Sequence, residues 1–213
     1  MAFTQIQICN NALDFIGAQP ITDIDATDDA SALVLARQWT FALREFVEAY
    51  PWGWAKVRTT LNAESPAPDF SWSYIYTLPD DFVTLVGLNE TYVDTPSDLY
   101  EINGESLLCD VGDTVDIEYI KIFVDLGSND VDDYLALMDG SCATALAVLL
   151  ASKIAPAICK DGVDGRSAQL LQRYLTVDLP RARVRWGNAQ RRAPEFPAAT
   201  STSLSARRYW PNR

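Results

Sequence analysis

Apolar residues recur at helical spacing between residues 4 and 50 of the chain. The first stripe lies between Thr4, a common N-cap residue, and Gly17, a common C-terminal stop; its members are Ile6, Cys9, Leu13 and Ile16. An acidic segment, 21–29, separates it from a second stripe, which Pro51 ends. The members of the second stripe are Ala32, Leu35, Ala36, Trp39, Leu43, Phe46, Val47 and Tyr50. This pattern predicts two amphipathic helices, each burying one face.

After Pro51 the pattern changes to short, β-rich runs that are broken by turn residues. The runs span residues 54–61, 74–78, 82–88, 100–102, 106–109 and 115–123, and residues 66–71 are expected to form a loop. Asn103-Gly104 separates two of these runs and predicts a type I′ hairpin turn, because both central residues of that turn need a positive φ. The middle of the chain is therefore predicted to be rich in antiparallel strands.

The helical period returns at Val131 and is apolar on nearly every side, which predicts a central buried helix. Its apolar members are Tyr134, Leu135, Met138, Cys142, Leu146, Leu149, Leu150 and Ile154. Pro156 is expected to kink or end this helix. Asp164 can cap a last helix, which Pro180 is expected to interrupt or bend. Beyond Arg192 the composition predicts an extended tail with an aromatic, basic tip.

These elements together predict an α+β fold. Residues 1–52 and 130–190 are expected to form a bundle of about four helices. Residues 53–129 are expected to form a small antiparallel, strand-rich insert, and residues 191–213 an extended basic C-terminal tail.

Charge divides the chain into two unequal parts. The 213 residues include 17 Lys+Arg and 29 Asp+Glu, for a net charge of -12. Residues 1–180 carry 9 basic and 28 acidic residues, whereas residues 181–213 carry 8 arginines and a single acid, Glu195. The sequence thus predicts an acidic body, net -19, and a basic C-terminal segment, net +7.

Histidine is absent, which removes the commonest general base near neutral pH and every catalytic triad that uses an imidazole. The four cysteines form no CxxC pair, so we expect buried, reduced thiols rather than a zinc site: Cys9, Cys109, Cys142 and Cys159. The N-terminus lacks a signal-peptide pattern, and the longest apolar run, 142–150, is short for a bilayer span. We expect neither secretion through a cleaved signal nor a membrane-embedded chain.

Several motifs admit a chemical and a structural interpretation. The acidic residues of 23–29 resemble a calcium loop, but Asp28 replaces the required glycine and Val34 the required glutamate, which favours helix capping. With so many acids, a carboxylate pair for glycoside hydrolysis stays possible, although nothing selects one. No phosphate-binding glycine motif is present. The tryptophans of 51–54 suit a sugar or nucleobase platform, and packing between helix and strands is the favoured interpretation.

The arginines of the C-terminal segment are the leading candidate binding residues. They either solubilise the end of the chain or bind an acidic partner or nucleic acid, and the aromatic tip favours binding because aromatic and arginine side chains carry much interface energy. The candidates are Arg181, Arg183, Arg185, Arg191, Arg192, Arg207, Arg208, Tyr209, Trp210 and Arg213.

The chain resembles the head-to-tail adaptor proteins of short-tailed bacteriophages, the tail tubular protein A family, over about residues 3–175. The N-terminal residues of this resemblance are Ile8-Cys9-Asn10, Ala12-Leu13, Ile16-Gly17-Ala18, Ile21-Thr22-Asp23, Ala36, Trp39, Arg44, Pro51-Trp52 and Ala55. Further along, in the family's order, come Leu78-Pro79-Asp80-Asp81, Tyr100-Glu101-Ile102-Asn103-Gly104, Leu107-Leu108 and Ile117-Glu118-Tyr119-Ile120. Pro180 departs from the family's uninterrupted last helix.

The resemblance implies a structural virion protein without enzymatic activity, cofactor or metal. Such adaptors assemble in the host cytoplasm as a ring, typically dodecameric, beneath the portal at the neck of the virion. The implied partners are the portal protein, a downstream nozzle or tail-tube protein, further copies of the chain, and DNA that passes the channel without specific binding. No membrane is implied. Two other classes remain open: a small carboxylate-dependent cell-wall hydrolase, and a nucleic-acid-binding module that acts through residues 181–213.

Overall fold

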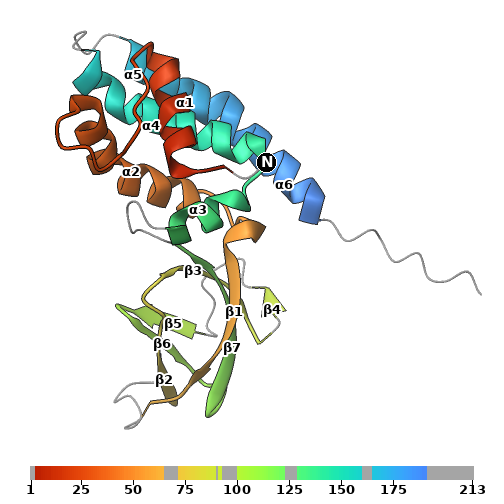
Figure 1. Cartoon of the computed structure of the whole chain (residues 1–213). Coiled ribbons are helices and arrows are strands. Elements are labelled where there is room, and N and C mark those ends of the chain that lie inside the picture. Colours follow the sequence, from red (N-terminus) through yellow and green to blue (C-terminus); the bar gives the residue numbers. More distant parts are fainter. Residues whose placement is uncertain are drawn as a thin grey trace, which may run out of the picture.

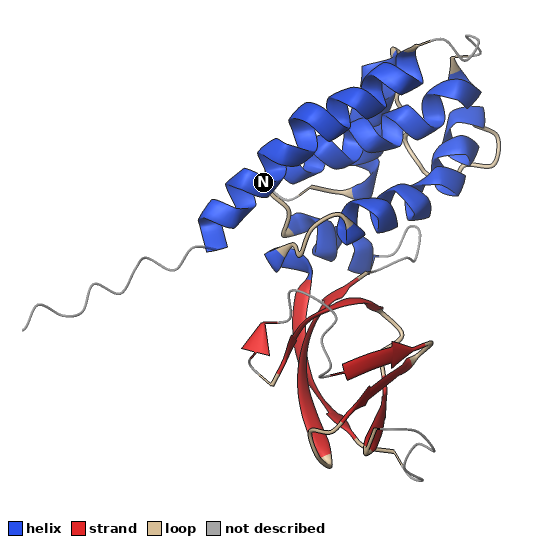
Figure 2. Cartoon of the chain, turned by 180° about the vertical axis from the view of Figure 1, so that it is seen from behind, coloured by secondary structure: helices blue, strands red, loops and turns tan. Residues whose placement is uncertain are grey.

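The structure, a computed structural model, describes residues 3–64, 72–89, 91–92, 100–122, 129–159 and 165–190. The chain combines helices with two antiparallel sheets, so the fold class is α+β. The helices are α1 (Gln5–Ile16), α2 (Ala30–Glu48), α3 (Asn129–Ala136), α4 (Gly140–Ile158), α5 (Arg166–Arg173) and α6 (Leu179–Gln190), with a 3-10 turn η1 (Gly53–Ala55) and a π turn η2 (Tyr174–Asp178). Figures 1 and 2 show the helices gathered at one end of the molecule and the strands at the other.

The ends of the first two helices follow from local side-chain chemistry. Thr4 and Gln7 form a capping box at the start of α1, and Gly17 ends the helix in the left-handed conformation with φ 73°. Asp29 caps α2 by accepting hydrogen bonds from the N–H groups of Ser31 and Ala32. The predictions for these helix ends are confirmed, and so is the capping role of the acidic segment before α2.

The apolar segment after Val131 forms two helices, so the prediction of one continuous helix is wrong. Asp139 accepts from the N–H groups of Ser141 and Cys142 and thereby starts α4 after a break. α4 itself is the expected central buried helix, because it packs against α1, α2, α5 and α6. Pro156 lies inside α4, two residues before its last residue.

The strands form a larger and a smaller sheet. The larger sheet has the order β1-β7-β3-β4, with β1 (Lys56–Asn62), β7 (Thr114–Lys121), β3 (Phe82–Leu88) and β4 (Thr91–Tyr92). The smaller sheet has the order β2-β6-β5, with β2 (Tyr74–Thr77), β6 (Ser106–Cys109) and β5 (Tyr100–Asn103). All paired strands are antiparallel. The sequence runs predicted six of these strands and missed the two-residue β4, while the predicted loop at 66–71 lies outside the described residues.

The hairpin between β5 and β6 turns one residue later than predicted. Asn103 pairs with Ser106, so the two loop residues are Gly104 and Glu105. Gly104 has a φ of 62°, whereas Asn103 stays in the extended strand. A positive φ at the first loop residue is typical of a type II′ turn, and the type I′ assignment is wrong.

Two apolar cores hold the molecule together. The larger one surrounds α4 and includes Val86 and Ile120 from the sheet and Ile122 just after β7, so it joins the helices to the strands. The smaller one lies between the two sheets, around residues such as Tyr76 and Ile117. Each sheet therefore buries its inner face, and the larger sheet also packs its end against the helices.

The tryptophans of 51–54 lie at this junction. Trp52 is fully buried, stacks on Phe46 of α2 and donates from its Nε1 to the Phe46 carbonyl at 2.8 Å. Trp54 contacts the ring of Tyr134 in α3, and the Tyr134 hydroxyl donates to the carbonyl of Lys121 at 2.7 Å. The packing interpretation of this cluster is confirmed.

The four cysteines are unpaired, and the expected burial holds for three of them but is wrong for Cys159, at the C-cap of α4. Cys9, Cys109 and Cys142 are buried, and Cys159 is partly exposed. Among the described residues, α4 is the helix whose length and composition would suffice to cross a membrane. α4 is buried against α1, α2, α5 and α6, as the core helix of a globular protein is.

Candidate functional site

Three of the ten candidate residues lie in the helix α6. α6 carries Arg181, Arg183 and Arg185 and no acidic residue, in contrast to the acidic body. Its C-terminal end projects beyond the other helices, as Figures 1 and 2 show from opposite sides. The other seven candidates, Arg191, Arg192, Arg207, Arg208, Tyr209, Trp210 and Arg213, lie outside the described residues.

Arg183 points toward α2 and has a structural role. Its Nη2 donates to the carbonyl oxygen of Ala49 at 2.6 Å, and its guanidinium lies 6.0 Å from the centre of the Tyr50 ring. Ala49 is the C-cap of α2, whose last carbonyls lack helical partners. Arg183 therefore joins α6 to the end of α2 and is not available to a partner in the way that Arg181 and Arg185 are.

Arg181 and Arg185 lie on another side of α6 and line a surface crevice, called here the α6 crevice. Its volume is about 120 Å³, and it lies between α6 and the first turn of α4. The residues that line it are Gly140, Ser141, Thr144, Asp178, Arg181 and Arg185. Arg181 and Arg185 are four residues apart and exposed, so their guanidinium groups are open to solvent on the same side of the helix.

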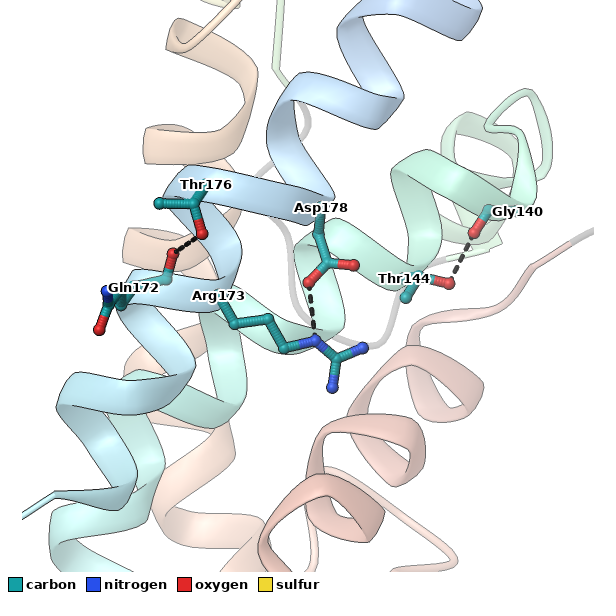
Figure 3. A network of polar contacts seen from close by, with 6 residues as sticks. All are labelled: Gly140, Thr144, Gln172, Arg173, Thr176 and Asp178. Carbon is teal, nitrogen blue, oxygen red and sulfur yellow. Dashed lines mark hydrogen bonds and ion pairs between the residues drawn. The ribbon is translucent and has the colours of Figure 1, made fainter.

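Asp178 forms the floor of the α6 crevice and is buried. Its carboxylate accepts from the Nε of Arg173 at 3.0 Å, as Figure 3 shows. The guanidinium of Arg173 also lies over the ring of Phe15 in α1, 4.8 Å from its centre. Across the crevice in α4, the hydroxyl of Thr144 donates to the carbonyl of Gly140 at 2.7 Å. The ion pair and these contacts hold the walls of the crevice in place.

Arg173 and Asp178 meet because the last helix contains a π turn. The N–H of Leu179 donates to the carbonyl of Tyr174, five residues back, and this wider turn brings residues five apart onto one side. Pro180 follows directly and supplies no N–H to the helix. The helix thus continues through Pro180, so Pro180 does not interrupt it, and the irregularity lies just before the proline, over 174–178. Gly165 is the N-cap of α5, and the predicted cap Asp164 lies outside the described residues.

Asp139 carries a second carboxylate at the edge of the α6 crevice. Its Oδ2 lies 3.4 Å from the Nε of Arg185. Its Oδ1 caps α4 by accepting from the N–H groups of Ser141 and Cys142 at 2.7 and 2.9 Å. Asp139 therefore positions Arg185 and satisfies the first free N–H groups of α4 at once.

The charged groups around the α6 crevice are suited to ionic binding. Burial, and next the charge of Asp139, raises the pKa of the nearby Cys142 thiol to about 12, so this thiol stays protonated near neutral pH. Burial also raises the pKa of Tyr174 well above its usual range. Among the described residues, no cluster of three or more Cys, Asp or Glu side chains is arranged to hold a metal ion. The exposed arginines are suited to carboxylate or phosphate groups.

Sequence reasoning found the arginines of the crevice but missed its other residues. Asp178 and Arg173 are five residues apart, a spacing that joins side chains only across a π turn. Ser141 and Thr144 come from α4 and reach the crevice through tertiary packing. The sequence does contain one signal for this wall of the crevice: Asp139-Gly140-Ser141 is a capping sequence that marks the start of α4.

Comparisons with known proteins add no relative. No protein-family model matches the chain, and no curated protein matches it in sequence.

Proposed function

We propose that the chain is a structural head-to-tail adaptor of a short-tailed bacteriophage. It forms a ring, dodecameric in the typical case, beneath the portal, extends the DNA channel and offers a docking platform to the next tail protein. The proposal extends the family resemblance of about residues 3–175. In this proposal the protein is part of the neck of the virion and performs no enzymatic reaction.

The observation that carries the proposal is the placement of α6. Three arginines of this acidic chain lie on one projecting helix, and residues 191–213, which follow that helix in the sequence, contain five more. A charged, aromatic-tipped segment of this kind suits attachment to a partner surface. We propose the portal as that partner.

The two-part architecture fits the same function. We propose that residues 1–52 and 130–190 act as an adaptor bundle of about four helices. Residues 53–129 would then be the insert that contacts the downstream tail protein, and residues 191–213 the arm that reaches the portal. Acidic residues that line the channel of such a ring would repel DNA phosphates and limit sticking during passage.

Truncation of the C-terminal segment tests the proposal. Deleting residues 193–213 is expected to abolish binding to purified portal rings, measured by sedimentation, while circular dichroism of the helices stays unchanged. A truncated chain that binds portal rings with unaltered affinity would show that the segment is not the attachment arm.

Nucleic-acid binding is the alternative that the arginines leave open. It predicts an affinity for duplex DNA that resides in 181–213 and falls steeply with salt. The net charge of -19 over residues 1–180 argues against DNA as the partner of the body.

A further inference from the structure

The α6 crevice holds more positive than negative groups. Arg173 pairs with Asp178 at 3.0 Å, and Arg185 pairs with Asp139 at 3.4 Å. No carboxylate among the residues that the structure describes pairs with Arg181, which lines the same crevice. Arg181 and Arg185 line the crevice together with one carboxylate, Asp178, whose charge Arg173 neutralises. Because Asp139 pairs with Arg185, the surplus positive charge is that of Arg181.

The N–H groups and hydroxyl in the first turn of α4 are not what would attract an anion to the crevice. Asp139 already accepts from the N–H groups of Ser141 and Cys142, so these two peptide groups are in use. The hydroxyl of Thr144 is also engaged, since it donates to the carbonyl of Gly140. An incoming anion would be recognised mainly by the guanidinium groups.

Aliphatic side chains flank Arg181 on the surface of the last helix. Val177 is 53% exposed and Val184 is 64% exposed, so both side chains offer apolar surface to a partner. Val184 lies three residues after Arg181 in α6, on the same side of the helix, and Val177 lies four residues before Arg181, in the π turn that precedes α6. Arg181 therefore has an exposed aliphatic side chain on either side of it along the chain.

We propose that the α6 crevice binds one aspartate or glutamate side chain of the partner protein, from a segment with aliphatic residues beside that acid. The acid pairs with Arg181 and Arg185, and the aliphatic neighbours cover Val177 and Val184. This inference rests on the proposed function, which makes the portal the partner.

The charges and size of the crevice favour a carboxylate over nucleic acid. The crevice contains Asp178 and has Asp139 at its edge, and these two carboxylates leave too little positive charge for a row of phosphates. A single carboxylate matches the single surplus charge, and a volume of about 120 Å³ admits one side chain rather than a duplex groove.

A matched pair of double variants of the full chain tests the inference. Arg181→Gln with Arg185→Gln removes two charges from the crevice; Arg44→Gln with Arg58→Gln removes two charges elsewhere. Arg44 and Arg58 are suitable controls because their side chains are 60% and 83% exposed and each pairs with a glutamate. With portal rings as the probe, the crevice variant is expected to bind about tenfold more weakly or worse, and the control like the parent chain. Equal affinities of the two variants would overturn the inference.

Carbodiimide coupling identifies the group that enters the crevice. This reagent joins a lysine amine to a carboxylate that it touches, so Arg181→Lys converts the crevice into a reporter. Mixed with portal rings, this variant is expected to form an amide to an Asp or Glu of the portal, found by mass spectrometry, whereas Arg58→Lys is not. If the portal binds but position 181 couples only to acids of its own chain, no partner carboxylate enters the crevice and the inference is wrong.

Two further outcomes separate this inference from the proposed function. If the parent chain fails to bind portal rings at all, the proposed function is wrong and the inference falls with it. If portal binding is unaffected while the crevice variant alone loses affinity for duplex DNA, the proposed function stands and the crevice is a nucleic-acid contact instead.

Discussion

Arg173 and Asp178 form an ion pair of 3.0 Å although they are five residues apart in one helical segment. The carboxylate is buried while the guanidinium is half exposed, and the π turn between them supplies the geometry. Asp178 lines the α6 crevice, so this pair fixes the position of one of its lining carboxylates.

Asp178→Asn should lower the free energy of unfolding by about 1–3 kcal/mol, because the buried charged hydrogen bond to Arg173 is lost. Glu48→Gln is the matched control, since it removes the exposed pair of Glu48 with Arg44 and should change stability by less than about 0.5 kcal/mol. Urea unfolding followed by circular dichroism measures both. Equal effects of the two changes would mean that the Arg173–Asp178 pair contributes no more than a surface pair.

Trp52→Phe should destabilise the junction of helices and strands by about 1–3 kcal/mol, because it removes the hydrogen bond to the Phe46 carbonyl and leaves a small cavity. Trp72→Phe is the control, since the Nε1 of Trp72 donates to Glu101 at the surface. In thermal unfolding, Trp52→Phe should have a clearly lower midpoint temperature than Trp72→Phe. Similar midpoints would contradict the central position that we assign to Trp52.

Gly104→Ala should cost about 1 kcal/mol, because alanine is strained at a φ of 62°. Asn103→Ala should leave stability almost unchanged, since Asn103 is extended and pairs with Ser106. The type I′ alternative predicts a cost at both positions. Chemical unfolding of the two variants therefore decides which two residues form the turn.

Alkylation should discriminate among the cysteines. Burial raises the pKa of the Cys9 and Cys142 thiols to about 12, with the charge of Asp139 adding to the rise at Cys142. Near neutral pH, iodoacetamide is expected to modify the partly exposed Cys159 first and to reach Cys9 and Cys142 only after unfolding. Peptide mass spectrometry gives the rates. Modification of Cys9 in the native chain at the rate of Cys159 would be inconsistent with this core.

Stability should fall at alkaline pH. Burial, together with the hydrogen bond to Asp81, raises the pKa of Tyr119 to about 12, and burial together with Cys109 raises the pKa of Tyr76 to about 12. In the unfolded chain a tyrosine titrates near pH ~10. The unfolded state therefore loses these protons first, so the stabilisation is complete below about pH 10 and disappears as the pH approaches about 12. Tyrosinate absorbance and unfolding curves at several pH values measure the effect; stability that is constant over this window would refute it.

The sequence correctly predicted features, such as helix ends, that depend on residues close together in the chain. Thr4 and Gly17 bound α1 because their caps involve only residues a few positions away. The hairpin was placed correctly but its turn was one residue off, because the pairing of Asn103 with Ser106 decides which residues enter the loop. The break before α4 escaped the apolar pattern, since Met138 and Cys142 keep the helical period across the cap at Asp139.

The candidate site was predicted only in part, because tertiary contacts decide which side chains line it. Arginines in a basic segment are visible in sequence, yet their roles depend on tertiary contacts. Arg183 faces the end of α2 and is structural, while Arg181 and Arg185 line the α6 crevice. Asp178 could not have been assigned to the crevice without the π turn.

Imaging a mixture of the purified chain and its portal by electron microscopy tests the central claim most directly. The adaptor proposal predicts a ring of this chain beneath the portal, coaxial with its channel, with α6 and the C-terminal segment directed toward the portal. Portal particles that carry no added ring at saturating concentrations of the chain would contradict it.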